Sequence, residues 1–321
     1  MSLGEFELID RFFKRPVQRA VLGVGDDCAL LQPTPGMQLA VSTDLLVEGR
    51  HFLSTVDPAR LGHKALAVNL SDLAACGAKP LGFTLSLALP RADERFLAPF
   101  AQGLLALADR HQIELVGGDT TAGPLTIGIT VFGEVPPGQA LLRSGARVGD
   151  DIWVSGWPGE ARLALEVFRG TLALGAEDFA QARLAMECPE PRIALGLALR
   201  GLATAAIDVS DGLLGDLGHV LRRSGVGAEL ALARMPRRAL LAGQLAAVQR
   251  IAWLTGGDDY ELLFCAPEGA DAALQAIATQ TGVPLHRIGQ VLPRGAGLRV
   301  LDEQGSPIDL TQLAGFDHFK S

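Results

Sequence analysis

Apolar positions in the first half of the chain follow two different periods. Short apolar runs typical of strands cover 37–42, 81–90, 113–118 and 124–135. Helical spacing runs from about residue 61 to residue 78 and again over 93–112. The first half is therefore predicted to mix strands and helices.

This pattern lapses between residues 136 and 150, where turn residues cluster. A chain of 321 residues is long enough for two domains of ordinary size. We therefore predict an N-terminal domain over 1–140 and a C-terminal domain over 141–321.

The second half again combines both types of element. Strand patterns cover 151–156, 205–210, 227–233 and 260–267, with two more near residues 285 and 298. Helical patterns extend through about residue 200 and then cover 212–224, 237–249 and 271–281.

One similarity links the two halves. Both 66–78 and 205–218 run from apolar residues through Ser-Asp into a run of small residues. An internal duplication is one hypothesis for this similarity, and chance is the other.

The composition indicates a globular protein. Hydrophobic residues make up 48% of the chain and charged residues 20%, so a substantial core can be buried. The net charge of −8 and the lack of a Lys/Arg stripe argue against a nucleic-acid partner.

No apolar stretch approaches the roughly 18 to 20 residues that span a bilayer, and the start lacks the order of a signal peptide. The four scattered cysteines are interpreted as small core residues of a reducing compartment, so a soluble cytoplasmic protein is expected.

Aspartates recur beside glycine or serine at the ends of the apolar runs. The six segments are GVGDDCALL, STDLLVEGRHF, NLSDLAACG, VGGDTTAG, IDVSDGLLGD and LTGGDDYEL. Turn chemistry or helix capping explains each one alone, but caps would use Ser, Thr and Asn as readily as Asp. Oxygen ligands without a histidine cluster suit Mg²⁺, which bridges a few carboxylates to substrate phosphates. The pattern therefore predicts metal–phosphate chemistry.

Several common phosphate-binding and nucleophile motifs are absent from the sequence. There is no GxxxxGK[ST] loop, and GVGDD lacks the third glycine of a dinucleotide fingerprint. Neither Ser71 nor Ser210 lies in GxSxG, which disfavours a serine nucleophile.

Arg143, in a glycine-containing connector, is the best candidate cation for a polyphosphate, with a boundary salt bridge as the alternative. His51 is a candidate for phosphate contact or acid–base chemistry, or else an ordinary histidine.

The ordered set of motifs resembles the bacterial thiamine-monophosphate kinase family over nearly the whole chain. The motifs are GEFELIDRFF, GVGDDCALL, STDLLVEGRHF, KALAVNLSDLAACGA, LVGGDTTAGPL, RSGARVGD, IDVSDGLLGDLGH, GGDDYELLF and GFDHF. The SDG and GGDDYEL pair also resembles the wider aminoimidazole ribonucleotide synthetase superfamily. The resemblance implies a two-domain α+β fold, with an N-terminal sheet that pairs in a dimer barrel and a C-terminal α/β sandwich. It also implies a homodimeric enzyme that phosphorylates thiamine monophosphate to thiamine diphosphate with ATP.

The resemblance implies a set of site residues as well. The Mg²⁺ positions would be Asp27, Ser42, Thr43, Asp44, Asp72, Asp119, Asp208 and Asp211, and the neighbouring Asp26 ranks just below them. The ATP contacts would be Gly118, Asp119, Arg143 and Ser210, and the thiamine phosphate contacts would be His51, Asp258 and Phe316. Within these sets, Asp44, Asp72 and Asp211 are assigned to catalysis, because bridged cations would cancel the repulsion between donor and acceptor phosphates.

Two positions depart from the family pattern. The family usually has Glu where this chain has Asp258, and often Trp or Tyr where it has Phe316. The shorter carboxylate of Asp258 is expected to reach the thiamine moiety through water or after a backbone shift. Phe316 keeps a stacking face but lacks a hydrogen-bonding group.

Two other classes of function stay open at this point. One is another ATP-using enzyme of the superfamily, such as an aminoimidazole ribonucleotide synthetase, a selenophosphate synthetase or a hydrogenase maturation protein. The absence of a cysteine before Cys28, near the glycine-rich start, speaks against the selenophosphate synthetase. The other class is a non-catalytic nucleotide or metal sensor that keeps the carboxylate scaffold.

Overall fold

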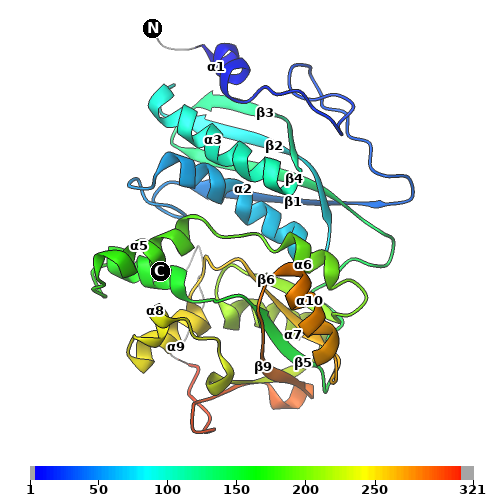
Figure 1. Cartoon of the computed structure of the whole chain (residues 1–321), viewed down its shortest axis with the longest axis vertical. Helices are drawn as coiled ribbons and strands as arrows, with labels where there is room; N and C mark the ends of the chain where they lie inside the picture. The colour runs from blue at the N-terminus through cyan, green and yellow to red at the C-terminus, as the bar shows by residue number, and fades with distance from the viewer. Residues whose placement is uncertain (1–3, 312–321) are drawn as a thin grey trace. The chain divides into compact units, whose positions relative to one another are not determined.

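The computed structural model describes residues 4–311, which form two compact units. One unit comprises the residues up to 73 together with 78–138, and the other comprises 74–77 and the residues from 139 onward. Each unit contains its own β-sheet (Figure 1). The predicted α+β class is confirmed.

A four-stranded sheet with the order β1-β4-β2-β3 forms the centre of the N-terminal unit. Its strands are β1 (Gln38–Val47), β2 (Lys79–Leu89), β3 (Glu114–Ala122) and β4 (Thr126–Val135). β4 pairs antiparallel with both β1 and β2, whereas β2 and β3 are parallel. The helices of this unit are α1 (Glu5–Phe12), α2 (Pro58–Ala75) and α3 (Glu94–His111).

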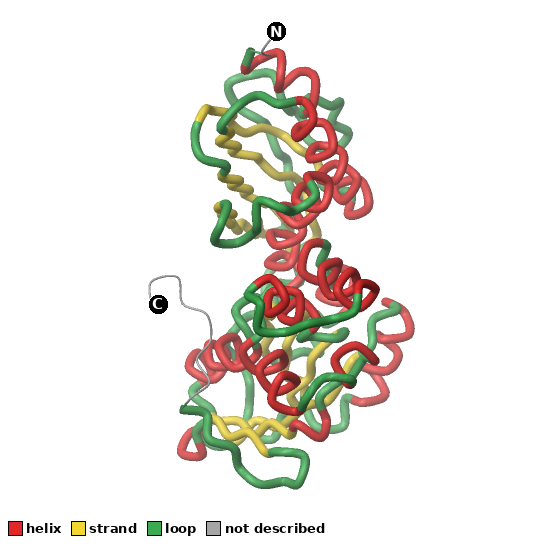
Figure 2. The backbone as a smooth tube through the Cα atoms, turned by 90° about the vertical axis from the view of Figure 1, so that its left-hand side faces the viewer, coloured by secondary structure: helices red, strands yellow, loops and turns green. Residues whose placement is uncertain are grey.

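The helices α2 and α3 lie on one face of this sheet (Figure 2). Phe83 of β2 and Phe100 of α3 are fully buried in the core that results. On the edge strand β1, by contrast, Leu39, Val41 and Leu45 are 49%, 56% and 58% exposed. Because these residues alternate along the strand, they all lie on the face of the sheet opposite to the helices. We call this the bare face.

A six-stranded sheet with the order β10-β7-β9-β5-β8-β6 forms the centre of the C-terminal unit. Its strands are β5 (Asp151–Ser155), β6 (Ala205–Val209), β7 (Gly227–Ala231), β8 (Glu261–Ala266), β9 (Leu285–Leu292) and β10 (Leu298–Leu301). Every residue of β5, β6 and β8 is buried. Successive side chains of a strand point to opposite faces, so both faces of this part of the sheet are covered.

Helices and short 3₁₀ turns make up the rest of the C-terminal unit. They are α4 (Glu160–Phe168), α5 (Ala176–Glu187), α6 (Ile193–Ala198), α7 (Leu213–Ser224), η1 (Leu232–Arg234), α8 (Ala239–Ala242), α9 (Ala246–Thr255), α10 (Asp271–Thr281) and η2 (Arg294–Ala296). Glycine in the left-handed conformation ends α7 at Gly225 and α10 at Gly282, as expected for helix C-termini. None of the helices between residues 4 and 311 combines the length and apolar character of a transmembrane segment.

The predicted elements are present, with differences mainly at their ends. The pattern did not indicate α1, and the strand predicted over 37–42 continues to Val47 because it pairs with β4 along its whole length. The single helix predicted over 237–249 is divided into α8 and α9, with Gly243 at the end of the first. Cys265 is buried but Cys28 is exposed, so the core interpretation is wrong for Cys28.

The duplication hypothesis is wrong for the two Ser-Asp segments. Ser71 and Asp72 lie within α2, whereas Ser210 and Asp211 lie in the turn between β6 and α7. Similar residues therefore occupy different secondary structures in the two units.

Candidate active site

Three of the predicted residues, Asp208, Ser210 and Asp211, lie at the end of β6 and in the turn that leads into α7. Asp208 is buried on the strand, whereas Asp211 is exposed. The carboxylate of Asp216, in the first turn of α7, accepts hydrogen bonds from the N–H groups of Ser210 (3.1 Å) and Asp211 (3.2 Å). Asp216 therefore fixes the backbone of the β6–α7 turn.

Burial and a neighbouring charge both act on the Asp216 carboxyl group. It is 4% exposed, and burial raises its pKa to about 7, with a further rise from the negative charge of Asp211. A cation beside these two carboxylates would relieve their repulsion. Asp211 is therefore the exposed carboxylate that this turn presents to a cation.

Arg143 lies beside the same turn, where its positive charge opposes the rise in the pKa of Asp216. Two hydrogen bonds hold this part of the connector. The Leu142 carbonyl accepts from the N–H of Ala206 on β6 (2.8 Å), and the Arg143 carbonyl accepts from Ser224 Oγ on α7 (3.4 Å). The predicted polyphosphate cation and the β6–α7 turn are thus brought together.

The β6–α7 turn packs backbone to backbone against the loop that precedes β8. Gly212 has a φ of 108°, and a Cβ there would lie 2.9 Å from the backbone of Thr255. A Cβ on Gly257 would lie 2.5 Å from the Ser210 carbonyl oxygen, which also accepts the N–H of Asp258 (2.9 Å). Glycine is required at both positions, so the SDG and GGDD motifs form one structural unit.

Asp258 and Tyr260 both have left-handed backbone conformations, with φ of 64° and 50°. Such conformations cost roughly 1–3 kcal/mol each and persist where neighbouring contacts impose them. Besides the Asp258 bond to Ser210, the N–H of Tyr260 donates to the Val209 carbonyl (2.8 Å), and the Tyr260 hydroxyl donates to Asp258 Oδ1 (3.3 Å). The predicted substrate contact Asp258 is therefore held in a strained, hydrogen-bonded turn. Phe316, the predicted aromatic contact, lies outside the described residues.

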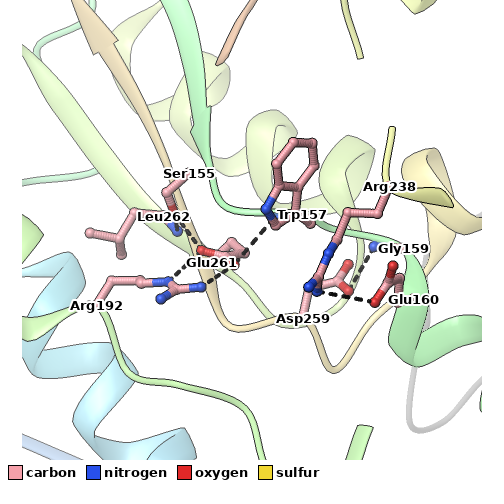
Figure 3. A network of polar contacts seen from close by, with 9 residues as sticks. All are labelled: Ser155, Trp157, Gly159, Glu160, Arg192, Arg238, Asp259, Glu261 and Leu262. Carbon is pink, nitrogen blue, oxygen red and sulfur yellow. Dashed lines mark hydrogen bonds and ion pairs between the residues drawn. The ribbon is translucent and has the colours of Figure 1, made fainter. Parts of the chain in front are cut away.

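A buried ionic network begins directly after this turn (Figure 3). The Glu261 carboxylate accepts from Arg192 Nε (2.7 Å) and Nη2 (2.6 Å) and from Ser155 Oγ (2.5 Å). Ser155 Oγ in turn accepts from the N–H of Leu262 (2.8 Å). A Cβ on Gly156, which has a φ of 60°, would overlap the same carboxylate. Loss of either Arg192 or Glu261 would leave the other as a buried unpaired charge, which is strongly destabilising. The network therefore holds the start of β8 in place, next to the loop that carries Asp258.

Asp259 connects this loop to the turn before α4. Its Oδ1 accepts from the N–H of Gly159 (2.8 Å), while its buried Oδ2 has no hydrogen-bond partner among residues 4–311. Burial raises the pKa of Asp259 well above its usual range, and the nearby acids Glu261, Asp258 and Glu160 add to the rise. The loop that carries Asp258 is therefore hydrogen-bonded to two other segments, the β6–α7 turn and the turn before α4.

In the N-terminal unit, Ser42, Asp44 and Asp72 form a second group. Ser42 Oγ donates to Asp72 Oδ2 (2.5 Å), and the N–H of Asp44 donates to Asn69 Oδ1 (3.1 Å). Asn69 and Asp72 belong to α2, so Ser42 and Asp44 lie on the helix-covered face of β1. Asp72 thus projects from the last turn of a helix and not from a helix start, where capping arguments would have placed it.

Thr43 and Asp119 lie on the bare face. Thr43 Oγ1 donates to the Ile129 carbonyl (3.0 Å), and Asp119 pairs with Ser86 on the opposite edge of the sheet. β1 and β3 are three strand steps apart, or about 14 Å. One Mg²⁺ ion, with ligands at about 2.1 Å, does not reach from Asp44 to Asp119 within this chain. The predicted ligands of this unit therefore form separate groups.

Gly118, a predicted ATP contact beside Asp119, has a structural reason to be glycine. Its φ is 146°, and a Cβ there would lie 1.9 Å from the Leu85 carbonyl oxygen of β2. The close approach of β3 to β2 excludes any side chain at this position.

Two further predicted residues lie in turns of the N-terminal unit. Asp27 is exposed in a loop that is closed at its base by hydrogen bonds between Leu22 and Leu30 (3.3 Å and 3.0 Å). The Nδ1 atom of His51 accepts from the N–H of Val47 (3.0 Å), just after β1. This bond assigns the proton of the neutral His51 ring to Nε2.

The donor chemistry fits magnesium that binds together with phosphate. Residues 4–311 contain no group of three or more His, Cys, Asp or Glu side chains that could hold a metal ion by themselves. Mg²⁺ typically takes one or two carboxylates and completes its shell with water and substrate phosphates. The Ser42–Asp72 pair and the Asp208–Asp211 segment offer oxygen ligands of this kind.

Sequence reasoning assigned no role to Asp216, Asp259 or Glu261, although all three lie within the motifs quoted above. A signal for Glu261 was available. An acid at the start of an apolar strand implies a buried charge, and a buried charge requires a partner. The partner itself, Arg192, could not be identified because it lies 69 positions away in the chain.

Comparison with known proteins places these sites in a family. A model described as AIR synthase related protein, N-terminal domain, matches residues 25–135, and one described as the C-terminal domain matches residues 147–300. The chain therefore belongs to the AIR synthase related proteins. Within them it belongs to the thiamine-monophosphate kinases, because the thiamine-monophosphate kinase of Salmonella typhimurium is 45% identical over 325 residues, which cover 99% of each chain. The resemblance inferred from the motifs is confirmed.

Solved structures agree with this assignment. The thiamine-monophosphate kinase from Stenotrophomonas maltophilia K279a is 45% identical, with a TM-score of 0.86 over 96% of this chain and 99% of that one. The structure of AaThiL complexed with AMPPCP and TMP is 28% identical, with a TM-score of 0.75 over 90% of this chain and 89% of that one.

Proposed function

We propose that this protein transfers the γ-phosphoryl group of ATP to thiamine monophosphate, which gives thiamine diphosphate and ADP. The observation that carries this proposal is the 45% identity to thiamine-monophosphate kinase over 99% of both chains. The complex of AaThiL with AMPPCP, an ATP analogue, and TMP supports the same pair of substrates.

The C-terminal unit supplies groups for both substrates. Arg143 would bind ATP phosphate oxygens bidentately, next to Ser210 on the turn that Asp216 holds. Asp258 would contact the thiamine moiety from its constrained turn, together with Phe316. In the N-terminal unit, Gly118 and Asp119 would contact ATP, and His51 would contact the substrate phosphate.

Magnesium is the proposed metal. Several ions are proposed, because Asp44 and Asp119 lie on opposite faces of one sheet. The residues that would hold them are Asp27, Ser42, Thr43, Asp44, Asp72, Asp119, Asp208 and Asp211. When bound, Mg²⁺ cancels the negative charge of the phosphates during in-line transfer. Within this set, Asp44, Asp72 and Asp211 are the residues assigned to catalysis, and they would orient the reacting phosphate groups. No side chain needs to act as a strong general base, because the acceptor phosphate oxygen is already ionised.

An ADP-release assay tests the proposed function. The purified protein receives ATP and Mg²⁺ with thiamine monophosphate, thiamine or an aminoimidazole precursor in parallel. We expect ADP release only with thiamine monophosphate, and loss of that activity when EDTA removes the metal. Turnover of the aminoimidazole precursor would indicate another enzyme of the superfamily, and nucleotide binding without any turnover would indicate a sensor.

We also propose that the bare face binds a second copy of the chain. Single exposed apolar residues are common on protein surfaces, but Leu39, Val41 and Leu45 form a stripe along one edge strand. A second copy presents the same stripe, so twofold pairing would remove both from water. This supports a homodimer.

We also propose a cytoplasmic location for the protein, because ATP is supplied inside the cell.

A further inference from the structure

Asp26 and Asp27 are carried by a segment without regular structure. Residues 18–34, here called the arm, lie between α1 and β1 and contain no helix and no strand of the two sheets. Because such a segment has few backbone partners of its own, its course depends on contacts with the rest of the unit.

Glu114, the first residue of β3, holds the beginning of the arm. Its carboxylate accepts hydrogen bonds from the N–H groups of Gln18 (2.7 Å), Arg19 (3.1 Å) and Ala20 (2.9 Å). Burial by itself would raise the pKa of Glu114, but these three bonds outweigh it and the pKa is lowered. The carboxylate is therefore charged at neutral pH, when hydrogen bonds to it are strong.

Glu134, near the end of β4, holds the other end of the arm. It is 3% exposed, and it accepts hydrogen bonds from the N–H (2.9 Å) and the Oγ1 (3.1 Å) of Thr34. Burial again favours a higher pKa for Glu134, and the bonds from Thr34 turn the net shift downward.

The two glutamates lie at the same end of the sheet. Glu114 pairs with Gly82 and Glu134 pairs with Lys79, both at the start of β2. Since β2 lies between β3 and β4, the two anchor points are about 10 Å apart across the strands.

The arm is much longer than the distance between its anchors. About 14 residues separate Ala20 from Thr34, and they could extend to roughly 46 Å. The surplus chain leaves the sheet as a loop, which the hydrogen bonds between Leu22 and Leu30 close at its base. Asp26 and Asp27 lie in this closed loop. The positions of their carboxylates therefore depend on the bonds to Glu114 and Glu134 and on the pairing of Leu22 with Leu30.

We propose that Glu114 and Glu134 are positioning residues that hold the arm at both ends and thereby place Asp26 and Asp27 for the magnesium–phosphate site. This inference rests on the proposed function. It assigns the two glutamates no contact with substrate or metal.

The test compares Glu114→Gln and Glu134→Gln with Glu94→Gln. Each variant removes one negative charge from the N-terminal unit, but Glu94 pairs with Arg11 on the surface and bonds no residue of the arm. Thr34→Val is a milder variant that removes only the Oγ1 bond to Glu134 and keeps the N–H bond. Two quantities are measured: hydrogen exchange of the peptide 18–34 in the metal-free protein, and the Mg²⁺ concentration for half-maximal ADP release.

In Glu114→Gln and Glu134→Gln, we expect exchange of the arm to accelerate about ten-fold or more. The Mg²⁺ requirement should rise by a similar factor, while kcat at saturating Mg²⁺ largely recovers. Thr34→Val should show a smaller change in the same direction, and Glu94→Gln should match the wild type. A Mg²⁺ requirement that stays at the wild-type value while the arm exchanges faster would overturn the positioning role.

The exchange measurement separates the two proposals. If the wild type releases no ADP with thiamine monophosphate, the proposed function fails. Faster exchange of the arm in Glu114→Gln would then still support the anchoring, and unchanged exchange would refute it.

Discussion

The two sheets of this protein differ in how they are covered. The N-terminal sheet carries helices on one face, and its edge strand β1 alternates between exposed and partly buried residues. In the C-terminal sheet, the strands β5, β6 and β8 are buried along their whole length. The sheet that is covered on both faces completes its core within its own unit, whereas β1 of the N-terminal sheet leaves Leu39, Val41 and Leu45 exposed to water.

The difference extends to how each unit holds its acidic residues. In the N-terminal unit, Glu114 and Glu134 are charged acceptors of backbone N–H groups, and their pKa values are lowered. In the C-terminal unit, burial raises the pKa values of Asp216 and Asp259. The first unit thus uses carboxylates to hold an irregular segment, while the second encloses them within packed loops.

The largest expected effect is the loss of a core side chain from the doubly covered sheet. Phe264 is fully buried in β8, beside Trp153 of β5 and Ala206 of β6. Phe264→Ala should lower the free energy of unfolding by about 3–5 kcal/mol, because it leaves a cavity. Leu45→Ala on the bare face should change it by less than about 0.5 kcal/mol at protein concentrations too low for association. Urea denaturation at low concentration measures both, and equal losses would contradict the contrast between the sheets.

The next effect concerns one carboxylate from each unit. Asp44→Asn and Asp211→Asn should each reduce turnover by at least roughly 100-fold, or about 2.7 kcal/mol in the transition state, while folding is retained. The assay is ADP release with thiamine monophosphate at saturating Mg²⁺, and circular dichroism checks the fold. Near-normal turnover in both variants would refute the metal–phosphate mechanism.

A smaller effect tests the partner of the bare face. Leu45→Asp should weaken association of the two copies at least about ten-fold, because it places a charge in the stripe that would be buried. Leu245→Asp is the matched control, since Leu245 is 78% exposed in the C-terminal unit. Light scattering during size-exclusion chromatography reports the mass. A wild type that is monomeric at micromolar concentration would show that the bare face does not pair.

The smallest effect is a difference in pH dependence between the units. The pKa of Asp259 is raised in the folded state, so between the unfolded pKa of about 4 and the raised folded pKa the folded protein binds more protons than the unfolded chain. The free energy of unfolding therefore falls as pH rises through this range. In Asp259→Asn this decline should disappear.

Glu134 should show the opposite sign. Its pKa is lowered, so its contribution is present above the unfolded value of about 4.5 and is lost as pH falls through the folded pKa. The Glu134→Gln variant should therefore be less stable than the wild type at neutral pH, and the gap should close in acid. Denaturation midpoints measured from pH 3 to pH 8 test both variants, and curves parallel to the wild type would contradict the assigned pKa shifts.

Much of the fold was predictable because its strands and helices have clear hydrophobic periods. The helix over 271–281 and the strand over 205–210 follow directly from such periods, whereas α1 was not indicated. For the candidate site, the motifs indicated which residues to consider, but not their surroundings. The assignments of the magnesium, ATP and substrate contacts remain predictions.

The amino-acid sequence by itself determined most of the strands and helices and the family, because both depend on local periodicity and on motifs of adjacent residues. Only the tertiary structure decided that Asp44 and Asp119 stand on opposite faces of one sheet, that Glu261 meets Arg192, and that Glu114 and Glu134 hold the arm. These relations depend on strand order and register, which join residues far apart in the chain. A local pattern carries no information about which distant backbone group a carboxylate will meet.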